Sequence, residues 1–372
     1  MSTLKVNTIK DNGTAIDLEN GILIGGTSPT QNYTASGTEP SSGNANGDYW
    51  WDTGNEKLYQ YFNGEFRAIT TVAPPPPLSH IGDRMLVAGG NTPATSAIRY
   101  IDLTGSGGST SFGSLTSARN GVSGSSSGSR GIFAGGIISN YINNIDYVTI
   151  STPGNSTDFG DLTTIQTVSS ASDGTTTVFG MWDGATTYNG GFSEITIATT
   201  GNATTRSGLL TQTRSNACGA SDGTKGFFFG GYASSGRVNT IDYVTIATAS
   251  SAIDWGDLTS VRYQQGQNSA CGNSSRVLHA GGNDGITYTN TIEYINPASA
   301  GNATDFGDLL AGMRFSSSAC NSTKACWVTG KSTTALLDTQ QIVTIDTTGN
   351  ATSFGTYNAT LQSCGACSGF PS

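Results

Sequence analysis

The sequence predicts an all-β protein, in which a six-bladed β-propeller follows a small N-terminal β-rich region. Three observations lead to this fold class. The chain contains 51 glycines and only 12% charged residues, a short motif recurs six times, and a proline-rich break precedes the repeats. Its apolar residues are mostly Ile, Val, Phe and Tyr, which together with glycine favour short strands joined by tight turns.

The recurring motif is an apolar strand that ends in glycine. It reads LVAGG, IFAGG, TVFGM, FFFGG, LHAGG and WVTGK, and its first glycine stands at 89, 135, 180, 230, 281 and 330. This reading leaves the second glycine missing at Met181 and Lys331. The spacing of 45 to 51 residues is typical of a supersecondary unit that stacks on its neighbours.

Three further strands complete each unit. The next strand reads IRYIDL, IDYVTI, FSEITI, IDYVTI, IEYINP and QIVTI, and the near-copies NNIDYVTIST and NTIDYVTIAT, from 143 and 239, belong to this series. The third strand reads SFGSLT, DFGDLT, DWGDLT, DFGDLL or SFGTYN, whereas the third unit has TRSGLL at 205. A strand of small residues ends the unit. Four strands in each of six units predict six blades.

The small-residue strands contain most of the six cysteines. Cys and Ser are interchangeable there as small residues on a crowded strand, so we interpret these cysteines as packing residues and the CGAC at 364–367 as a weak redox motif. Cys326 lies in another strand and is expected in the core. The residues placed in one column are Ser123, Ser169, Cys218, Cys271, Cys320 and Cys367.

The glycine pair, the tyrosine of the next strand and the aromatic residue near the fourth strand resemble the kelch repeat. The chain from about 80 to 372 therefore resembles a six-bladed kelch-like β-propeller. In a kelch-like blade the small-residue strand precedes the glycine-pair strand, but this array begins with RMLVAGG and ends with CGACSGF. We expect the C-terminal strand to complete the first blade, which leaves no open edge.

Residues 1–72 do not follow the repeat, and TVAPPPPL at 71–78 is a semi-rigid connector. We place an N-terminal region at 1–72, a linker at 73–78 and the propeller at 79–372. The segment GDYWWDTGNEKLYQYFNGEF alternates aromatic and polar residues around TGNEK and NG. This pattern predicts consecutive hairpins.

The opening MSTLKVNTIKDNG and the segment GDYWWDTGNEKLYQY are similar to the N-terminal regions of bacteriophage tail-fibre proteins, notably those of marine phages. The NTIDYVTIAT repeat is similar to propeller repeats of such phage structural proteins. The resemblance implies a virion protein on the extracellular face of the tail, often a homotrimer. Its N-terminal region would dock on the tail, baseplate or an adaptor protein. The expected docking residues are Leu4, Val6, Ile9, Trp50, Trp51 and Tyr59.

The connections after the glycine pairs differ from unit to unit. Variable loops on a rigid scaffold are where recognition residues concentrate, and aromatic side chains there stack on sugar rings or pack on proteins. The resemblance implies that this part faces the host and binds a surface glycan or protein. Ordinary loop packing is the alternative for each candidate. The candidate receptor-contact residues are Tyr141, Trp182, Tyr188, Tyr232 and Tyr288.

Charge and hydropathy narrow the partners. The net charge is −9 and Lys and Arg do not cluster, so nucleic acid is not an expected partner. No apolar run of eighteen residues and no signal-peptide pattern is present, so we expect neither membrane insertion nor secretion through a leader.

We expect no catalytic residues, cofactor or metal. His80 and His279 are too few for the copper site of kelch-like oxidases. The aspartate pair of DFGD recurs in three units, which favours turn capping over the single asymmetric pair of a glycosidase, with calcium binding as the alternative. The SDGT at 172 and 221 is only a fragment of a sialidase Asp-box.

One arginine precedes the small-residue strand in four units, and this repetition suggests a structural role. These arginines are Arg119, Arg214, Arg262 and Arg314. The chain is therefore interpreted as a non-enzymatic tail-fibre adhesin. A tail adaptor or decorating protein that binds other phage proteins is the first alternative, and a carbohydrate-active enzyme is the second.

Overall fold

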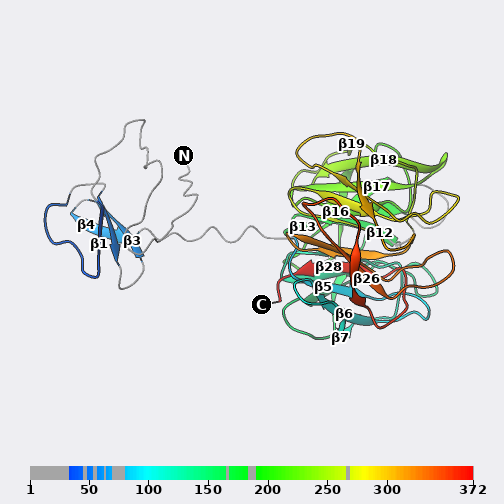
Figure 1. Cartoon of the computed structure of the whole chain (residues 1–372), viewed down its shortest axis with the longest axis horizontal. Helices are drawn as coiled ribbons and strands as arrows, with labels where there is room; N and C mark the ends of the chain where they lie inside the picture. Colours follow the sequence, from blue (N-terminus) through cyan, green and yellow to red (C-terminus); the bar gives the residue numbers. More distant parts are fainter. Residues whose placement is uncertain are drawn as a thin grey trace. The chain divides into compact units, whose positions relative to one another are not determined.

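Short strands form the regular structure of this chain. The computed structural model describes residues 33–44, 48–52, 57–62, 64–68, 80–164, 167–182, 190–264 and 269–371. These residues contain β-strands and no helix, which confirms the all-β prediction. Two compact units divide the chain at Pro77 and Leu78 (Figure 1). No helix of the described part has the length and hydropathy to cross a bilayer.

The first unit contains one sheet of order β1-β2-β3-β4. Its strands are β1 (Tyr33–Ser36), β2 (Tyr49–Asp52), β3 (Lys57–Phe62) and β4 (Glu65–Ala68). β1 pairs parallel with β2, whereas β2–β3 and β3–β4 are antiparallel, which confirms the predicted consecutive hairpins. Trp50 is 5% exposed and stacks on Tyr59 across the hairpin, with ring centroids 4.7 Å apart. The expected linker lies outside the described residues.

The second unit contains six antiparallel sheets of four strands each, which we number 1 to 6. Sheet 1 consists of β28 (Gly365–Gly369), β5 (Arg84–Ala88), β6 (Ala97–Asp102) and β7 (Thr110–Ser114). Sheet 2 consists of β8 (Ser123–Ser126), β9 (Arg130–Ala134), β10 (Asn144–Thr149) and β11 (Thr157–Asp161). Sheet 3 consists of β12 (Thr167–Ser172), β13 (Thr176–Trp182), β14 (Gly191–Thr196) and β15 (Thr204–Leu209).

The remaining three sheets follow the same order. Sheet 4 consists of β16 (Cys218–Ser221), β17 (Lys225–Ala233), β18 (Gly236–Thr245) and β19 (Ile253–Asp257). Sheet 5 consists of β20 (Ala270–Gly272), β21 (Val277–Ala280), β22 (Thr291–Ile295) and β23 (Thr304–Asp308). Sheet 6 consists of β24 (Ser317–Cys320), β25 (Lys324–Val328), β26 (Thr339–Thr344) and β27 (Thr352–Thr356).

The first strands of the six sheets contact one another in a cycle. β8, β12, β16, β20, β24 and β28 are in contact in this order, and β28 contacts β8 again. The C-terminal strand β28 pairs antiparallel with β5, with Gly365 opposite Ala88, as the repeat register predicts (Figure 1). Because the two ends of the repeat array share sheet 1, the cycle of contacts depends on the last residues of the chain.

Small residues are required where the first strands approach one another. A Cβ atom on Gly124 would lie 2.2 Å from the carbonyl oxygen of Ala366, and one on Gly219 would lie 2.4 Å from that of Ser170. The cysteines follow the same rule but not the predicted single column. Cys218 lies opposite Phe229, directly before a glycine pair, whereas Cys271 and Cys320 lie two and three positions further along their strands. The loops before β16 and β24 are equally long, so the Ala-Cys pairs fall at different positions of their strands.

Two glycine pairs also differ from their predicted form. In sheet 2 both glycines of the pair, Gly135 (φ 65°) and Gly136 (φ 121°), adopt left-handed backbone conformations. In sheet 6 the two residues with these conformations are Thr329 (φ 56°) and Gly330 (φ 108°). Gly330, predicted as the first glycine of its pair, is therefore the second residue of the turn. In sheet 3, β13 continues through Gly180 to Trp182 without such a turn. The first position of this turn accommodates the side chain of Thr329. The second does not accommodate one, because a Cβ on Gly330 would meet the carbonyl oxygen of Arg314 at 3.0 Å.

Buried ion pairs explain three of the four repeated arginines. Arg119 and Arg214 lie 3.4 Å and 2.7 Å from carboxylate oxygens of Asp146 and Asp242 in the third strand of their own sheet, and both side chains are buried. Arg262 pairs with Glu293 in the same way. In sheet 6 Met313 stands at the position of these arginines. Its backbone carbonyl accepts a hydrogen bond from the NH of Gly282, just as the carbonyl of Arg119 accepts one from the NH of Gly90. Arg314 is therefore wrongly assigned to this structural set.

The DFGD aspartates lie in strands β11, β19 and β23 rather than in turns. Asp254 Oδ1 accepts from the backbone NH of Gly256 at 3.0 Å, but turn capping is not the shared role of the motif. The central glycine of each motif packs on a Gly-Asn turn of the next sheet: a Cβ on Gly160 would lie 2.5 Å from the carbonyl of Gly201. The Asn202 side chain accepts from the backbone NH of Asp161 at 3.0 Å. The equivalent contacts join Asp257 to Asn302 and Asp308 to Asn350. The motif thus connects neighbouring sheets.

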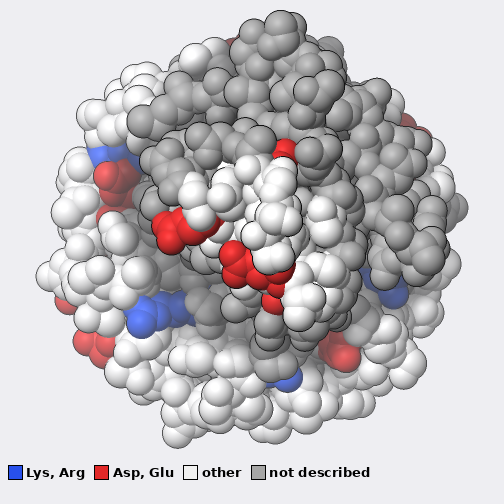
Figure 2. Space-filling model, turned by 90° about the vertical axis from the view of Figure 1, so that its left-hand side faces the viewer, with Lys and Arg blue, Asp and Glu red and all other residues white. Residues whose placement is uncertain are grey.

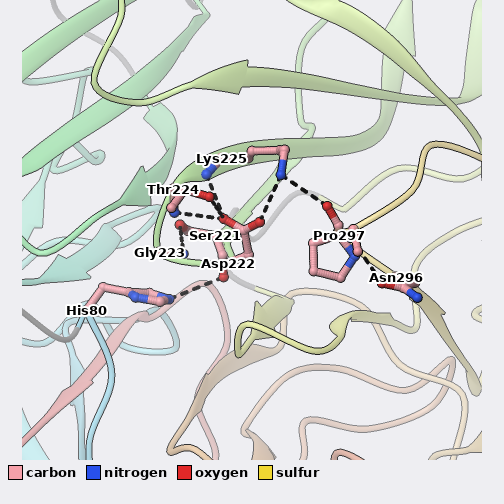
Figure 3. A network of polar contacts seen from close by, with 9 residues as sticks. His80, Ser221, Asp222, Gly223, Thr224, Lys225, Asn296 and Pro297 are labelled. Atoms are coloured by element: carbon pink, nitrogen blue, oxygen red, sulfur yellow. Dashed lines mark hydrogen bonds and ion pairs between the residues drawn. The ribbon is translucent and has the colours of Figure 1, made fainter. Parts of the chain in front are cut away.

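A cation of each sheet also bonds to a backbone carbonyl at the end of the third strand of the next sheet. In five sheets this hydrogen bond comes from a basic residue that stands directly before or at the start of the second strand. Figure 3 shows one example, the bond from Lys225 to the carbonyl of Pro297. In sheet 3 that position is Thr176, and Arg206 of β15 donates to Ile246 instead. The other donor and acceptor pairs are Arg84 to Ile150, Arg130 to Ile197, Arg276 to Ile345 and Lys324 to Leu103.

Candidate functional site

The structure places the predicted contact residues in different surroundings. Tyr232 lies in β17 and Tyr288 in the loop between β21 and β22. Tyr141 lies in the loop between β9 and β10, where it forms a backbone bridge with Ile137. Trp182 ends β13, and Tyr188 lies outside the described residues. Of the five, Tyr232 and Tyr288 belong to one cluster of side chains.

We call this group the Tyr–Arg cluster: Tyr232, Arg237, Tyr263, Tyr288 and Arg314. The rings of Tyr232 and Tyr263 meet edge to face with centroids 5.6 Å apart. The guanidinium carbon of Arg237 lies over both rings, 5.9 Å from Tyr232 and 5.2 Å from Tyr263. All three side chains are half-buried. Arg237 therefore lies against two aromatic surfaces that come from neighbouring sheets.

Arg314 completes the cluster from sheet 6. Its Nη1 donates to the hydroxyl of Tyr263 at 3.4 Å, and its guanidinium carbon lies 4.7 Å from the ring of Tyr288. The ring of Phe315, the next residue, lies on the same guanidinium at 4.3 Å. Two arginines thus contact opposite parts of one tyrosine, Arg237 at its ring and Arg314 at its hydroxyl.

Backbone bridges hold these residues in place. Tyr232 and Ser215 exchange two backbone hydrogen bonds of 2.8 Å and 2.9 Å, and Tyr263 and Asn283 exchange bonds of 3.2 Å and 3.0 Å. Gly285 allows the loop between β21 and β22 to approach Arg237, because a Cβ atom there would lie 3.0 Å from Nη1. The cluster is consequently ordered without a ligand, which reduces the entropy lost on binding.

The arginines of the cluster have unused hydrogen-bonding capacity. Neither Arg237 nor Arg314 forms an ion pair with an acidic side chain that the structure describes. The Nε atoms of both are buried, and no described group accepts from them. The nearby Asp284 carboxylate accepts from the backbone NH groups of Thr287 and Ile286, which lowers its pKa. A guanidinium stacked on tyrosine in this way is suited to binding carboxylate, sulfate or phosphate oxygens.

Sequence reasoning missed Arg237 and Tyr263 and assigned Arg314 to the scaffold. The available signal was the aromatic residue Tyr263 directly after the repeated Arg262. Tyr263 is brought to Tyr232 only by the packing of sheet 5 on sheet 4, which no local pattern encodes.

The central cavity of the second unit is small. Its volume is about 60 Å³. Residues of the first strands line it, such as Ser125, Ala220 and Ala319, together with His80, which precedes β5. His80 Nε2 lies 3.2 Å from the carbonyl oxygen of Ser221 (Figure 3). Burial lowers the pKa of His80. A space of this size holds water-sized molecules only.

The SDGT segment from 221 is a hydrogen-bonded turn. Asp222 Oδ1 accepts from the backbone NH groups of Thr224 and Lys225 at 2.7 Å and 2.6 Å. The Lys225 ammonium then lies between Asp222 and the carbonyl of Pro297 in sheet 5 (Figure 3). The Asp-box fragment thus serves the contact between sheets 4 and 5.

The cysteines are buried thiols. All six are buried, and none forms a disulfide bond. Burial raises the pKa of Cys218, Cys364 and Cys367 to about 12, so the thiolate that redox chemistry requires is strongly disfavoured. Within the described ranges no three or more His, Cys, Asp or Glu side chains are arranged to hold a metal ion.

The expected docking residues fall into two groups. Trp50 and Tyr59 pack on each other in the first unit, and Trp51 lies in β2 opposite Leu58. Leu4, Val6 and Ile9 lie outside the described residues.

Charged side chains are scattered over the face seen in Figure 2, where most of the described surface is uncharged.

No protein-family model matches the chain, and no curated protein matches its sequence.

Proposed function

We propose that this chain is a non-enzymatic bacteriophage virion protein, a tail fibre or tail-associated adhesin. Its first unit docks on the tail, baseplate or an adaptor protein, as a homotrimer, and its second unit contacts a glycan or protein of the host surface. The similarity of MSTLKVNTIKDNG and GDYWWDTGNEKLYQY to tail-fibre N-termini supports the assignment to a virion.

The second unit is proposed to be a six-bladed kelch-like β-propeller. Six four-stranded antiparallel sheets, the cycle of contacts among their first strands and the pairing of β28 with β5 support this architecture. The contacts from DFGD to Gly-Asn turns and from cations to carbonyls repeat between successive sheets. Such repetition is typical of blades that pack on equivalent neighbours.

The Tyr–Arg cluster is the observation that favours host recognition. Tyr288 lies on a connection that varies between the repeats, Tyr232 directly follows a glycine pair, and the cluster joins residues of three successive sheets. Rigid aromatic and arginine side chains with ordered positions dominate the binding energy of recognition surfaces. The cluster thus combines a fixed framework with unsatisfied hydrogen-bond donors.

Binding of the full-length chain to whole host cells tests the proposal, with an isogenic strain that lacks surface polysaccharide as control. Saturable binding that is lost on the control strain is expected for a glycan adhesin. Saturable binding that persists on the control identifies a protein receptor. Absence of binding to both strains contradicts the adhesin proposal.

Deletion of residues 1–72 tests the docking assignment separately. Particles grown with the deleted protein are expected to lack it when they are purified and probed by immunoblotting. If the deleted protein is still incorporated, the docking function does not belong to the first unit. An assay for cleavage of host envelope glycans by the full-length chain separates an adhesin from the enzyme alternative.

A tail adaptor is the second candidate. Ile286 is 96% exposed at the tip of the loop between β21 and β22, and Leu310 is 54% exposed before β24. Contact with another virion protein would bury these two side chains. Presence of the chain on virions, together with no binding to host cells, would favour this role.

A further inference from the structure

We infer that the Tyr–Arg cluster binds an oxyanion group of an acidic polysaccharide, held between the guanidinium groups of Arg237 and Arg314. The inference rests on the proposed function, because it names the class of surface ligand that the adhesin recognises. The bound group is a carboxylate of a uronic acid or a sulfate ester.

Arg237 differs from the other stacked arginines of the second unit. Arg84, Arg130 and Arg276 lie over tyrosines too, yet each also donates to a backbone carbonyl of the next sheet. Arg237 donates no hydrogen bond to any described residue, although its Nε is buried. Its Nε is closed off from solvent, as in Arg119 and Arg262, so the Nη groups of Arg237 are the donors that a ligand would meet. The other stacked arginines serve the scaffold, and Arg237 does not.

Two positive groups contact Tyr263, and neither forms an ion pair with a described acidic side chain. Arg237 lies 5.2 Å from its ring centroid, and Arg314 Nη1 lies 3.4 Å from its hydroxyl oxygen. The repulsion between like charges disfavours this arrangement unless an anion is present. In the same region Arg262 is neutralised by Glu293, which shows how the fold treats a structural arginine.

Phe315 supplies an independent observation. Its φ is 61°, a left-handed conformation that is unfavourable for a bulky residue. The residues at the same place before the first strands of sheets 2, 4 and 1 are Gly121 (φ 68°), Asn216 (φ 54°) and Ser363 (φ 58°), which are smaller. Sheet 6 instead places an aromatic ring on the Arg314 guanidinium at 4.3 Å. Strained residues of this kind concentrate at functional sites.

Saccharide is favoured over an acidic peptide by the composition of the cluster. The two guanidiniums lie over the rings of three tyrosines, and the hydroxyl of Tyr263 accepts from Arg314. Tyrosine hydroxyls bond to sugar hydroxyls, and aromatic surfaces contact the apolar face of a pyranose. Gly285 keeps the loop between β21 and β22 close to Arg237, so a side chain there would obstruct the guanidinium.

The test measures binding of the full-length chain to polygalacturonate, dextran sulfate and neutral dextran by isothermal titration calorimetry. Binding to an acidic polymer and none to neutral dextran is expected, and the acidic polymer that binds more tightly identifies the carboxylate or the sulfate as the preferred group. Binding to neither acidic polymer, or equal binding to neutral dextran, overturns the inference.

The residues are tested with Arg237→Gln and Arg314→Gln, each of which should weaken binding roughly tenfold or more, as expected for a charge-assisted hydrogen bond. Lys331→Gln is the matched control, because it removes one charge next to Arg314 in a backbone bridge without touching the tyrosines. It should weaken binding less than about threefold, as for a screened charge. An equal loss in the control would show that binding is non-specific attraction and would overturn the inference.

Phe315→Asn is the second variant, since Asn216 adopts the same backbone conformation in sheet 4. It should raise the thermal unfolding temperature and weaken binding to the acidic polymer. A stabilised variant that binds as tightly as the unsubstituted chain would remove the strain argument. Thermal unfolding of all variants shows whether they remain folded.

The two proposals fail in different ways. Binding of the chain to host cells without binding to an acidic polymer contradicts the oxyanion inference and leaves host attachment intact. Binding to an acidic polymer without binding to host cells contradicts host attachment and leaves the chemistry of the cluster intact.

Discussion

Nη1 of Arg206 donates a hydrogen bond of 2.9 Å to the backbone carbonyl of Ile246 in the neighbouring sheet. In the other sheets this type of bond comes from the second strand, as from Arg130 to Ile197. Sheet 3 has Thr176 there, and Arg206 takes the fourth-strand place that Phe159 holds in sheet 2. The irregular TRSGLL copy therefore preserves the contact between sheets by moving the cation to another strand.

The exchange of residues in sheet 3 predicts a coupled set of substitutions. Arg206→Phe alone should lower the free energy of unfolding by about 2–3 kcal/mol, because it removes a charged donor from Ile246 and leaves Glu194 without its partner. Adding Thr176→Arg and Glu194→Tyr should recover most of this loss, since sheet 2 has Arg130, Tyr147 and Phe159 at these places. Urea unfolding measures both. A triple variant no more stable than Arg206→Phe would contradict the interpretation.

The buried pair of Arg214 and Asp242 predicts a large loss from a small change. Asp242→Asn should lower the free energy of unfolding by about 3–5 kcal/mol, because it leaves a buried guanidinium without its carboxylate. Asp158→Asn, at an exposed position in β11, is the matched control and should change it little.

Sheet 6 suggests how the loss can be compensated. It has Met313 and Gln341 in place of an ion pair, with the Gln341 amide 3.9 Å from the Met313 sulfur. The combination Arg214→Met with Asp242→Gln should therefore be more stable than Asp242→Asn in the same urea titration. If it is less stable, the ion pair and the Met–Gln pair are not equivalent.

His279 predicts a pH dependence of stability. It is fully buried on Phe229, and burial and the neighbouring Arg262 charge hold its pKa well below the ordinary value. The unfolded chain, with a pKa of about 6.5, then binds more protons below that pH, so stability is complete above about 6.5 and decreases as the pH falls. The limiting slope is about 1.4 kcal/mol per pH unit for this residue.

The variant His279→Phe isolates this contribution. Phe133 and Phe228 occupy the equivalent places before the glycine pairs of sheets 2 and 4, so the ring fits. Unfolding in urea between pH 6.5 and 5 should show a smaller loss of stability for the variant. Burial also lowers the pKa of His80, so this residue should maintain part of the pH dependence of stability in the variant. An unchanged slope would show that His279 is not protonated on unfolding.

The buried cysteines predict low reactivity. Ellman's reagent at pH 8 should react with no thiol of the native chain and with six after denaturation, because all six thiols are buried. Cys218→Ser should leave the fold intact, since Ser123 holds the same place in sheet 2. Fast reaction of Cys364 or Cys367 in the native protein would instead support redox chemistry of the CGAC segment.

The recognition cluster illustrates the limit of sequence reasoning. Tyr232 and Tyr288 were found because they lie on variable loops after a repeated glycine pair. Tyr263 and Arg237 lie on different sheets, and their contact with Tyr232 depends on the angle at which sheet 5 packs on sheet 4. Arg314 was misassigned because sheet 6 has Met313 in the arginine position, and Arg314 stands one residue later, at the place that Tyr263 holds in sheet 5.

The sequence by itself determined the all-β class, the six repeats and the pairing of the C-terminal strand with the first repeat, because alternation of apolar residues and the spacing of turn residues are local properties. Only the tertiary structure decided which side chains cross between sheets. A contact such as Arg206 with Ile246, or Arg237 with Tyr263, depends on the distance between two backbones, and residues far apart in the chain set that distance through packing.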